Sequence, residues 1–225
     1  MNQSKLKLIL AIAFVAVFIV LAVLTLSGTF SGFETWAADL MAQSRTQTLT
    51  SWVTIITYLG SFPVLCVLTV LLLIIPQTRK KLGYPAALAI IISALLNIIL
   101  KDIFMRIRPD GMLVQEAGFS FPSGHAQNST AFFVALVLLV LNNIKSVKIK
   151  LPLVCVCIII PLIVGWSRLY LGVHYAGDVL SGWVLGASVA LFIDVLWQFL
   201  NIKLKKYKKL HNFLFESEKP KDINQ

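Results

Sequence analysis

Residues 121–130 have the sequence FPSGHAQNST and lead directly into an apolar run, AFFVALVLLVL, over residues 131–141. Pro122 cannot continue a helix and Ser123 is a favoured N-cap residue, so this pattern predicts a helix that begins near Gly124. A helix start offers unpaired N–H groups and the positive end of the macrodipole, both of which favour an anion. The stretch therefore predicts an anion-binding site at the mouth of a membrane-spanning helix.

The whole chain has the composition of a membrane protein. It has 225 residues, of which 58% are hydrophobic, whereas soluble domains average about 45–50%. A helix needs about 20 apolar residues to cross the hydrocarbon layer. Six segments meet this requirement: about Leu8–Ser27, Trp52–Ile75, Tyr84–Ile103, Gln127–Leu141, Leu151–Leu171 and Val179–Leu200. The sequence predicts an all-α, polytopic membrane protein with six transmembrane helices in one domain, residues 1–202, and a basic cytoplasmic tail, residues 203–225.

The positive charge follows a membrane topology. The formal net charge is +10, but most basic residues lie on alternate connections between the predicted spans. These are Lys5, Lys7, Arg79, Lys80, Lys81, Lys145, Lys148, Lys150, Lys203, Lys205, Lys206, Lys208, Lys209, Lys219 and Lys221. The positive-inside rule places these connections and both termini in the cytoplasm. This distribution argues against nucleic acid as a partner.

Three features outside the central motifs have structural interpretations. Residues 200–215, LNIKLKKYKKLHNFLF, fit either a basic amphipathic helix on the anionic inner leaflet or a plain topology anchor. Asp194 lies too far along the last span to join an outer site, and we expect a paired or cytoplasm-facing acid. The segment Gly28–Ser51 has capping-box spacing at Ser31 and Glu34. It also has an apolar stripe that predicts a short interfacial helix, a lid or packing element: Phe33, Trp36, Ala37 and Leu40.

The remaining basic residues lie on the predicted outer side, against the topological bias, and so ask for another explanation. They are Arg45, Lys101, Arg106, Arg108 and Arg168. Within KDIFMRIRP, residues 101–109, Lys101 and Arg108 are seven residues apart and share a face if the helix persists, with Pro109 ending it. Asn97 and Ser93 lie one and two turns earlier on the same stripe. Snorkelling towards the interface is an alternative for Lys101 alone.

A third polar segment, SRLYLGVHYAGD, covers residues 167–178. His174 and Asp178 are four residues apart, so the carboxylate can accept a proton from one imidazole nitrogen and leave the other as a lone pair. A histidine oriented by an aspartate is the general arrangement of a base or a nucleophile. His125, beside the predicted helix start, can give a proton to a bound group. Each motif alone also fits an ordinary structural role.

Together the three segments converge on one membrane face. They supply three cations, a helix start and two histidines: Lys101, Arg108, Arg168, Ser123, Gly124, His125 and His174. Three cations with oriented N–H groups form a pocket for a dianion such as phosphate. Ionisable residues at a membrane boundary are functional candidates by default. The sequence therefore predicts phosphate chemistry at the outer face.

The combined pattern K-x6-R-P, P-S-G-H and S-R-x5-H-x3-D resembles the three-part signature of the type-2 phosphatidic acid phosphatase superfamily. That superfamily includes lipid phosphate phosphatases and, more distantly, vanadium haloperoxidases. The match spans residues 101–178, and every signature position is intact. The resemblance implies a six-helix membrane architecture, in agreement with the predicted spans.

The resemblance also implies a mechanism. His174 attacks phosphorus and forms a phosphohistidine, Asp178 holds its tautomer, and His125 protonates the leaving oxygen. The phosphate-binding residues are Lys101, Arg108, Ser123, Gly124 and Arg168. We expect no metal and no cofactor, because the cations already supply charge and the sequence offers no further cluster of ligands.

The implied substrate is a membrane lipid phosphate that enters laterally from the bilayer. Undecaprenyl diphosphate, phosphatidylglycerophosphate and phosphatidic acid all fit, and the expected location is a bacterial plasma membrane. Two alternatives stay open: a phosphotransferase that uses the same intermediate, and a non-catalytic phospholipid-binding or transport protein. The sequence gives no oligomeric state.

Overall fold

The structure is a computed structural model, and it describes residues 3–214. The elements in chain order are α1 (Gln3–Leu26), α2 (Ser31–Gln43), α3 (Gln47–Thr57), the 3-10 turn η1 (Tyr58–Gly60), α4 (Phe62–Ile74), α5 (Pro76–Thr78), the π-helical turn η2 (Arg79–Gly83), α6 (Tyr84–Phe104), α7 (Gly124–Asn143), α8 (Val147–Tyr170), α9 (Ala176–Leu204) and α10 (Lys208–Leu214). The regular elements of this part of the chain are all helical, which confirms the predicted fold class.

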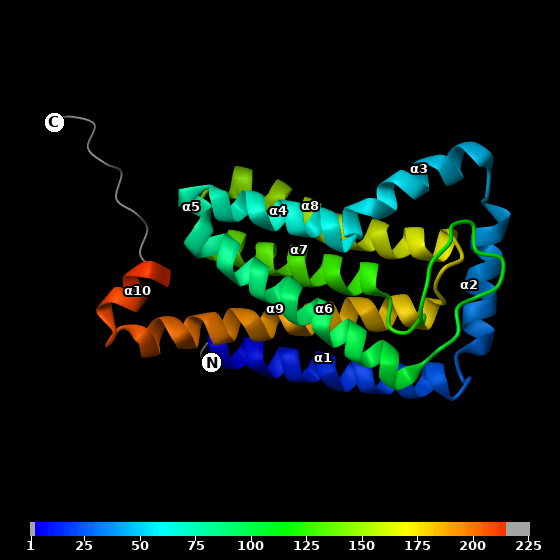
Figure 1. The fold of residues 1–225 in the computed structure, drawn as a ribbon, viewed down its shortest axis with the longest axis horizontal. Helices are drawn as coiled ribbons and strands as arrows, with labels where there is room; N and C mark the ends of the chain where they lie inside the picture. The colour runs from blue at the N-terminus through cyan, green and yellow to red at the C-terminus, as the bar shows by residue number, and fades with distance from the viewer. Residues whose placement is uncertain (1–2, 215–225) are drawn as a thin grey trace.

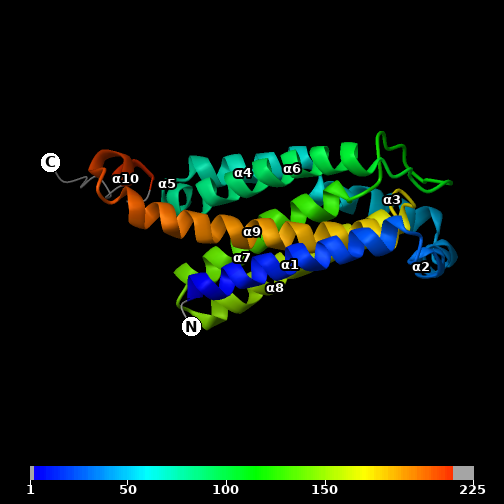
Figure 2. The same ribbon diagram turned by 90° about the horizontal axis from the view of Figure 1, so that it is seen from below.

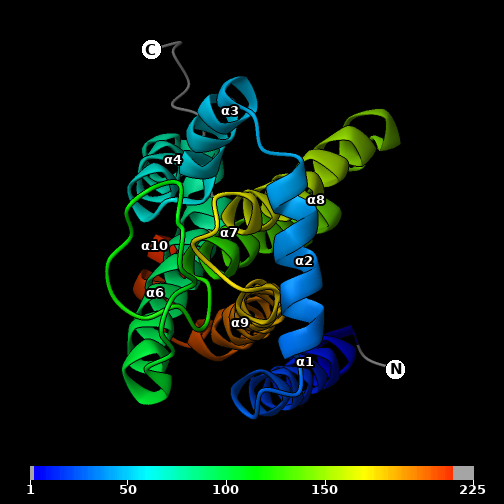
Figure 3. The same ribbon diagram turned by 90° about the vertical axis from the view of Figure 1, so that its right-hand side faces the viewer.

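The long helices run side by side along one axis, and α2 lies across one end of the bundle (Figures 1 and 2). We call this the loop end, because the irregular segment 105–123 lies there as well. Viewed from the loop end, α2 crosses in front of α8, α9 and α1 (Figure 3). The first turn of α1 and the helix α10 lie at the opposite end (Figure 1). The predicted basic connections between spans also meet at this opposite end.

Within residues 3–214, five helices are long and apolar enough to cross a membrane, and the bent pair α3 and α4 makes a sixth span if it is counted as one. The sequence predicted a continuous helix over Trp52–Ile75, and this detail is wrong. The chain bends by 49° between the two helices, and Ser61 at the break has extended backbone angles. Pro63 explains the break, because its ring and missing N–H prevent the preceding turn from continuing as α-helix.

The start of α7 is fixed by close contact with its neighbours. A Cβ atom added to Gly182 of α9 would lie 2.8 Å from the Ser123 carbonyl oxygen, so the two backbones touch there. On the other side, Asn97 of α6 donates hydrogen bonds to the carbonyl oxygen of Pro122 (3.2 Å) and to Gln127 Oε1 (2.8 Å). The predicted polar stripe on α6 therefore anchors the first turn of α7.

Lys101 and Arg108 do not share a helix face, because the condition for that arrangement, a helix that persists to Arg108, is not met. Helix α6 ends at Phe104, and Met105 adopts a left-handed conformation with φ of 46°. Pro109 disfavours helical backbone angles at Arg108, so it keeps the chain from resuming a helix there. The chain then continues as an irregular segment, so Arg108 reaches the site from a loop.

The predicted short helix after Gly28 is present as α2, and Phe33, Trp36 and Leu40 are exposed on it. The predicted capping box is wrong: Phe30 is the N-cap and makes no side-chain cap hydrogen bond. Glu34 is instead buried against other helices. An interfacial position for α2 stays a prediction.

At the opposite end, Asp194 lies 2.7 Å from Lys7 Nζ, which confirms the predicted paired acid. Helix α9 continues to Leu204 and α10 covers part of the predicted basic tail. Residues 215–225 of that tail lie outside the described residues, so its role stays a prediction.

Candidate active site

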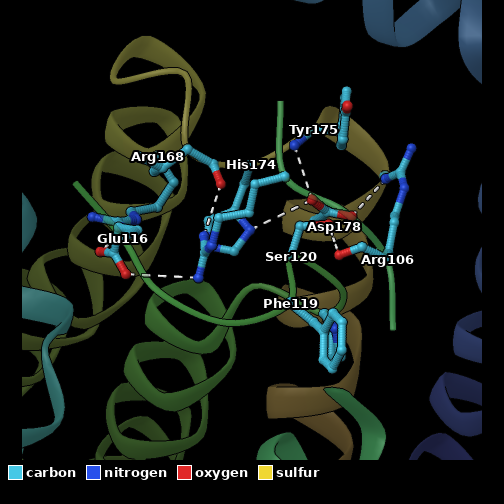
Figure 4. A network of polar contacts seen from close by, with 12 residues as sticks. Arg106, Glu116, Phe119, Ser120, Arg168, His174, Tyr175 and Asp178 are labelled. Atoms are coloured by element: carbon cyan, nitrogen blue, oxygen red, sulfur yellow. Dashed lines mark hydrogen bonds and ion pairs between the residues drawn. The ribbon is translucent and has the colours of Figure 1, made fainter. Parts of the chain in front are cut away.

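The elements that carry the three predicted motifs meet at the loop end of the bundle (Figure 1). Figure 4 shows His174 there with Asp178, Arg168 and Glu116. Helix α6 and the 105–123 segment bring one motif, the start of α7 brings the second, and the α8–α9 junction brings the third. Residues that are far apart in the chain thus surround the side chain of His174. The contacts of each predicted side chain determine what it can do there.

His174 lies in the short connection before α9, and its side chain is only 2% exposed. Its Nδ1 atom is 3.4 Å from Asp178 Oδ2. This contact is longer than an ordinary hydrogen bond, and Nδ1 has no other hydrogen-bond partner among the described residues. Burial lowers the pKa of His174 to about 4, against the opposing effect of Asp178. The imidazole is therefore neutral at pH 7, and Asp178 favours the proton on Nδ1.

Asp178 is fully buried in the first turn of α9, where Arg106, the Tyr175 backbone and His174 converge on its carboxylate. Oδ2 accepts a hydrogen bond from the backbone N–H of Tyr175 (2.9 Å), and Oδ1 accepts one from Arg106 Nη1 (2.6 Å). The Asp178 carbonyl oxygen also accepts from the backbone N–H of Ser123 (3.0 Å). The start of α7 and the carboxylate behind His174 are thereby fixed to one another.

Arg108 stands on the other side of the imidazole. Its Nη1 atom is 3.3 Å from His174 Nε2 and donates to the Val173 carbonyl oxygen at 2.9 Å. Its Nε and Nη2 atoms donate to the carbonyl oxygens of Gly118 and Ala117, both at 3.0 Å. With the proton on Nδ1, the Nε2 lone pair points at a cation, where an incoming phosphate oxygen would also be attracted.

Arg168 is almost completely buried near the end of α8. Its Nη1 donates to Thr57 Oγ1 at 2.9 Å, and its Nη2 forms an ion pair with Glu116. The Glu116 carboxylate is also 3.7 Å from Arg108 Nη2. Burial raises the pKa of Glu116, but the charges of Arg168, His125 and Arg108 outweigh it and hold the pKa below its usual range. Glu116 is therefore ionised, and its carboxylate binds Arg168 and lies close to Arg108.

The first turn of α7 is less simple than its sequence predicts. Ser123 is the N-cap, as expected, but its side chain makes no cap hydrogen bond. Gly124 faces Asn97, whose Oδ1 would lie 2.9 Å from an added Cβ atom, so close packing against α6 also requires a glycine there. His125 is half-buried in the first turn of α7.

Lys101 is half-buried in the last turn of α6. Its Nζ atom donates a hydrogen bond to the Phe119 carbonyl oxygen of the 105–123 segment. The lysine is therefore bound to the same segment that carries Arg108 and Glu116. This contact favours a role at the site over snorkelling.

Three buried polar atoms at the site have no hydrogen-bond partner among the described residues. They are Ser123 Oγ, Arg168 Nε and His174 Nδ1. A buried unsatisfied polar group costs about 1–3 kcal/mol, so such groups are uncommon unless they have a ligand or a catalytic role. Their concentration around one histidine indicates a site for a polar ligand.

Sequence reasoning missed three residues of this arrangement: Glu34, Arg106 and Glu116. Arg106 pairs with both Glu34 and Asp178, each 72 residues away in the chain. No local pattern links residues at that separation. The only available signal was that Arg106 places a positive charge on the predicted outer side. A cavity of about 480 Å³ borders this cluster and is lined in part by Glu34, Arg45, Arg106, His174 and Tyr175.

Among the residues that the structure describes, no group of three or more histidine, cysteine, aspartate or glutamate side chains has an arrangement that could hold a metal ion. The positive charge at the site comes from arginine and lysine side chains. The absence of a metal or cofactor from the reaction stays an expectation.

Comparison with known proteins identifies the family. A family model described as the PAP2 superfamily matches residues 82–202, more than half of the chain. Phosphatidylglycerophosphatase B of Bacillus subtilis is 36% identical over 117 residues, which cover 51% of this chain and 56% of that protein. An undecaprenyl-diphosphatase of Sulfolobus acidocaldarius is 29% identical over 171 residues, covering 73% of this chain and 78% of that protein. The chain thus aligns with little more than half the length of the first relative.

A solved structure gives the same result. The crystal structure of a transmembrane PAP2-type phosphatidylglycerolphosphate phosphatase from Bacillus subtilis superposes with a TM-score of 0.75 at 26% identity. The superposition covers 84% of this chain and 96% of that chain. The resemblance inferred from the motifs is confirmed: this multi-pass integral membrane protein belongs to the PAP2 superfamily.

Proposed function

We propose that this PAP2 protein is a membrane lipid phosphatase that hydrolyses a phosphomonoester or diphosphate of a lipid through a phosphohistidine on His174. One observation carries the proposal. A buried, neutral imidazole lies between a carboxylate at Nδ1 and an arginine at Nε2. This arrangement orients a nucleophilic lone pair towards a place where a phosphate group would be held.

In the first step, His174 Nε2 attacks phosphorus and the bond from phosphorus to the lipid oxygen breaks. The leaving oxygen takes a proton from His125, and Asp178 stabilises the positive charge that develops on the His174 ring. The equatorial phosphate oxygens are held by Lys101, Arg108, Arg168 and the Ser123–Gly124 turn. Such electrostatic stabilisation is the main catalytic resource in phosphoryl transfer.

In the second step, water attacks the phosphohistidine. His125, left neutral by the first step, takes a proton from that water, and the bond from phosphorus to Nε2 breaks. Inorganic phosphate leaves, His174 returns to its neutral form, and His125 is protonated again. Each residue therefore ends the cycle in the state in which it began.

The arginines proposed to bind phosphate also have a carboxylate partner within the chain. Glu116 contacts Arg168 and lies 3.7 Å from Arg108, where a substrate oxygen would bind. A phosphate dianion carries more charge and more acceptor oxygens than one carboxylate. We therefore expect the substrate to take the place of Glu116 on the arginines.

The site is proposed to face the outer side of a bacterial plasma membrane, with both termini in the cytoplasm. The support is that the site lies at the loop end, while the basic connections lie at the other end of the bundle, which the positive-inside rule assigns to the cytoplasm. The names of the relatives favour phosphatidylglycerophosphate or undecaprenyl diphosphate as substrate. Phosphatidic acid is the third candidate.

The test is phosphate release by the full-length protein in detergent, with EDTA present, on these three lipids. Wild-type protein is compared with His174→Ala and with His211→Ala, a matched histidine on α10 at the opposite end. Release that is lost only in His174→Ala supports the proposal, and the ranking of lipids identifies the substrate. No release by folded, lipid-bound wild-type protein would favour phosphotransfer or binding, and a loss with EDTA that Mg²⁺ restores would contradict the metal-free mechanism.

A further inference from the structure

Arg106 connects the Asp178 carboxylate behind His174 (Figure 4) to Glu34 of α2, the helix that lies across the loop end. Its Nη1 donates to Asp178 Oδ1 at 2.6 Å and to Glu34 Oε1 at 3.0 Å, and its Nη2 donates to Glu34 Oε2 at 2.6 Å. The guanidinium also lies over the Tyr175 ring, 4.1 Å from the ring centroid. A bidentate pair of this kind holds both partners in a fixed orientation.

Glu34 is itself held from two sides. It is buried on α2, and its Oε1 atom also accepts a hydrogen bond from the backbone N–H of Gly177 at 3.2 Å. A Cβ atom at Gly177 would lie 2.7 Å from that oxygen, so only glycine admits the carboxylate there. Helix α2 is thereby joined to the first turn of α9, one residue before Asp178.

The two oxygens of Asp178 have different partners. Oδ2 serves the Tyr175 backbone and faces His174, whereas Oδ1 is taken by Arg106. The interaction with Arg106 therefore determines which carboxylate oxygen is presented to the imidazole. The positive charge of Arg106 also partly cancels the electrostatic effect of Asp178 on His174. The negative charge of Glu34 in turn partly cancels the effect of Arg106.

We propose that Arg106 and Glu34 are positioning residues that orient the Asp178 carboxylate towards His174 and set its effective charge, so that α2 is part of the catalytic framework. This inference rests on the proposed function, because it assigns a role relative to the nucleophile. Neither residue touches the reacting atoms. Both act through Asp178, in the way that outer-shell partners orient a reactive group.

The proposal makes a prediction of sign. Loss of the Arg106 charge leaves Asp178 more negative, which raises the pKa of His174. Loss of the Glu34 charge leaves Arg106 more positive, which lowers the pKa of His174. The other charged or titratable residues around His174 are the same in both variants: Arg108 and Glu116 from the 105–123 segment, Lys101 from α6, His125 from α7, Arg168 from α8, Asp178 from α9, and Tyr175 in the connection before α9.

The experiment is the pH dependence of kcat/KM for the full-length protein in detergent, with a short-chain phosphatidic acid as substrate. Activity falls at low pH when His174 becomes protonated, so the acidic limb follows its pKa. We expect Arg106→Gln to lower kcat/KM by about tenfold or more and to move the acidic limb to higher pH. Glu34→Gln is expected to move the limb to lower pH with a smaller loss.

Two further variants separate positioning from folding. Arg106→Lys keeps the charge but loses the two-pronged contact, so we expect reduced kcat with an acidic limb near that of wild type. Asp39→Asn removes an exposed carboxylate from the same helix and is expected to match wild type in both respects.

An acidic limb that stays at the wild-type pH in both Arg106→Gln and Glu34→Gln would overturn the proposal, even if both variants lose activity through instability. Shifts of the same sign in the two variants would also overturn it. An inactive wild-type protein would contradict the proposed function itself, and the His174→Ala comparison detects that failure separately.

Discussion

Two arginine–carboxylate contacts lie on either side of His174, and they are built differently. Asp178 is fully buried in the first turn of a long helix, and its carboxylate meets Arg106, the Tyr175 backbone and the imidazole. Glu116 lies in an irregular segment, and its side chain is 26% exposed where it meets Arg168. Gly111 and Gly118, on either side of it, both have φ of 72°, a conformation that glycine adopts without strain.

The difference indicates two functions for one kind of contact. Moving Asp178 would leave buried partners unsatisfied, and breaking a buried ion pair costs about 3–5 kcal/mol. Moving Glu116 leaves the buried Arg168 side chain without its carboxylate until another anion takes that place, but the Glu116 carboxylate itself is already 26% exposed. Under the proposed function, we expect the first contact to hold geometry and the second to be exchanged for the substrate.

The largest expected effect comes from breaking the fixed contact at its centre. Asp178→Asn replaces an acceptor of three donors by an amide whose NH2 group cannot accept, so the tautomer of His174 is no longer specified. We expect kcat to fall by about 10⁴-fold, as for a triad aspartate in serine proteases. Phosphate release measures the loss, and a thermal unfolding curve checks that the variant is folded. A folded variant that keeps a tenth of wild-type activity would contradict the role given to Asp178.

The fixed contact also shows where sequence reasoning ends. Apolar runs and the start signal at Ser123 are local, so they predicted the spans and the beginning of α7. The spacing of His174 and Asp178 is local too, and the structure places these side chains together. By contrast, the apolar run Trp52–Ile75 concealed the break at Ser61, because hydropathy does not record backbone angles.

The parts that were missed depend on contacts between distant segments. Arg106 meets Glu34 and Asp178 only because α2 folds across the loop end, and the spacing of Glu34 from Ser31 suggested a capping box instead. Glu116 has no periodic pattern around it. The role proposed for Glu116 rests on contacts with Arg168 and Arg108, the two arginines that the motifs had assigned to phosphate binding.

A smaller effect is expected from changing Arg168, which contacts Glu116 and is also proposed to bind the substrate phosphate. Arg168→Lys keeps the positive charge but loses the planar fork that reaches Thr57 and Glu116, and it removes the buried Nε donor. We expect kcat/KM to fall by about 10²-fold, the typical cost of one lost donor at a developing charge. Unchanged kcat/KM would show that only the charge of Arg168 is used.

The smallest effect, and the sharpest test of the comparison, is expected at the exchangeable contact. Glu116→Gln keeps the size of the side chain but removes the charge that competes with a phosphate for Arg168. The inhibition constant of orthovanadate, a phosphate analogue, should fall by about fivefold, which corresponds to roughly 1 kcal/mol. Phosphate release at increasing vanadate concentration gives this constant.

Asp110→Asn is the matched control, because Asp110 is an exposed carboxylate on the same segment. It should leave the inhibition constant of vanadate near the wild-type value, since a general change in surface charge is screened by salt. Weaker vanadate inhibition in Glu116→Gln would mean that the carboxylate helps to bind the phosphate group. Glu116 would then belong with Asp178 as a fixed part of the site, and the distinction between the two contacts would fail.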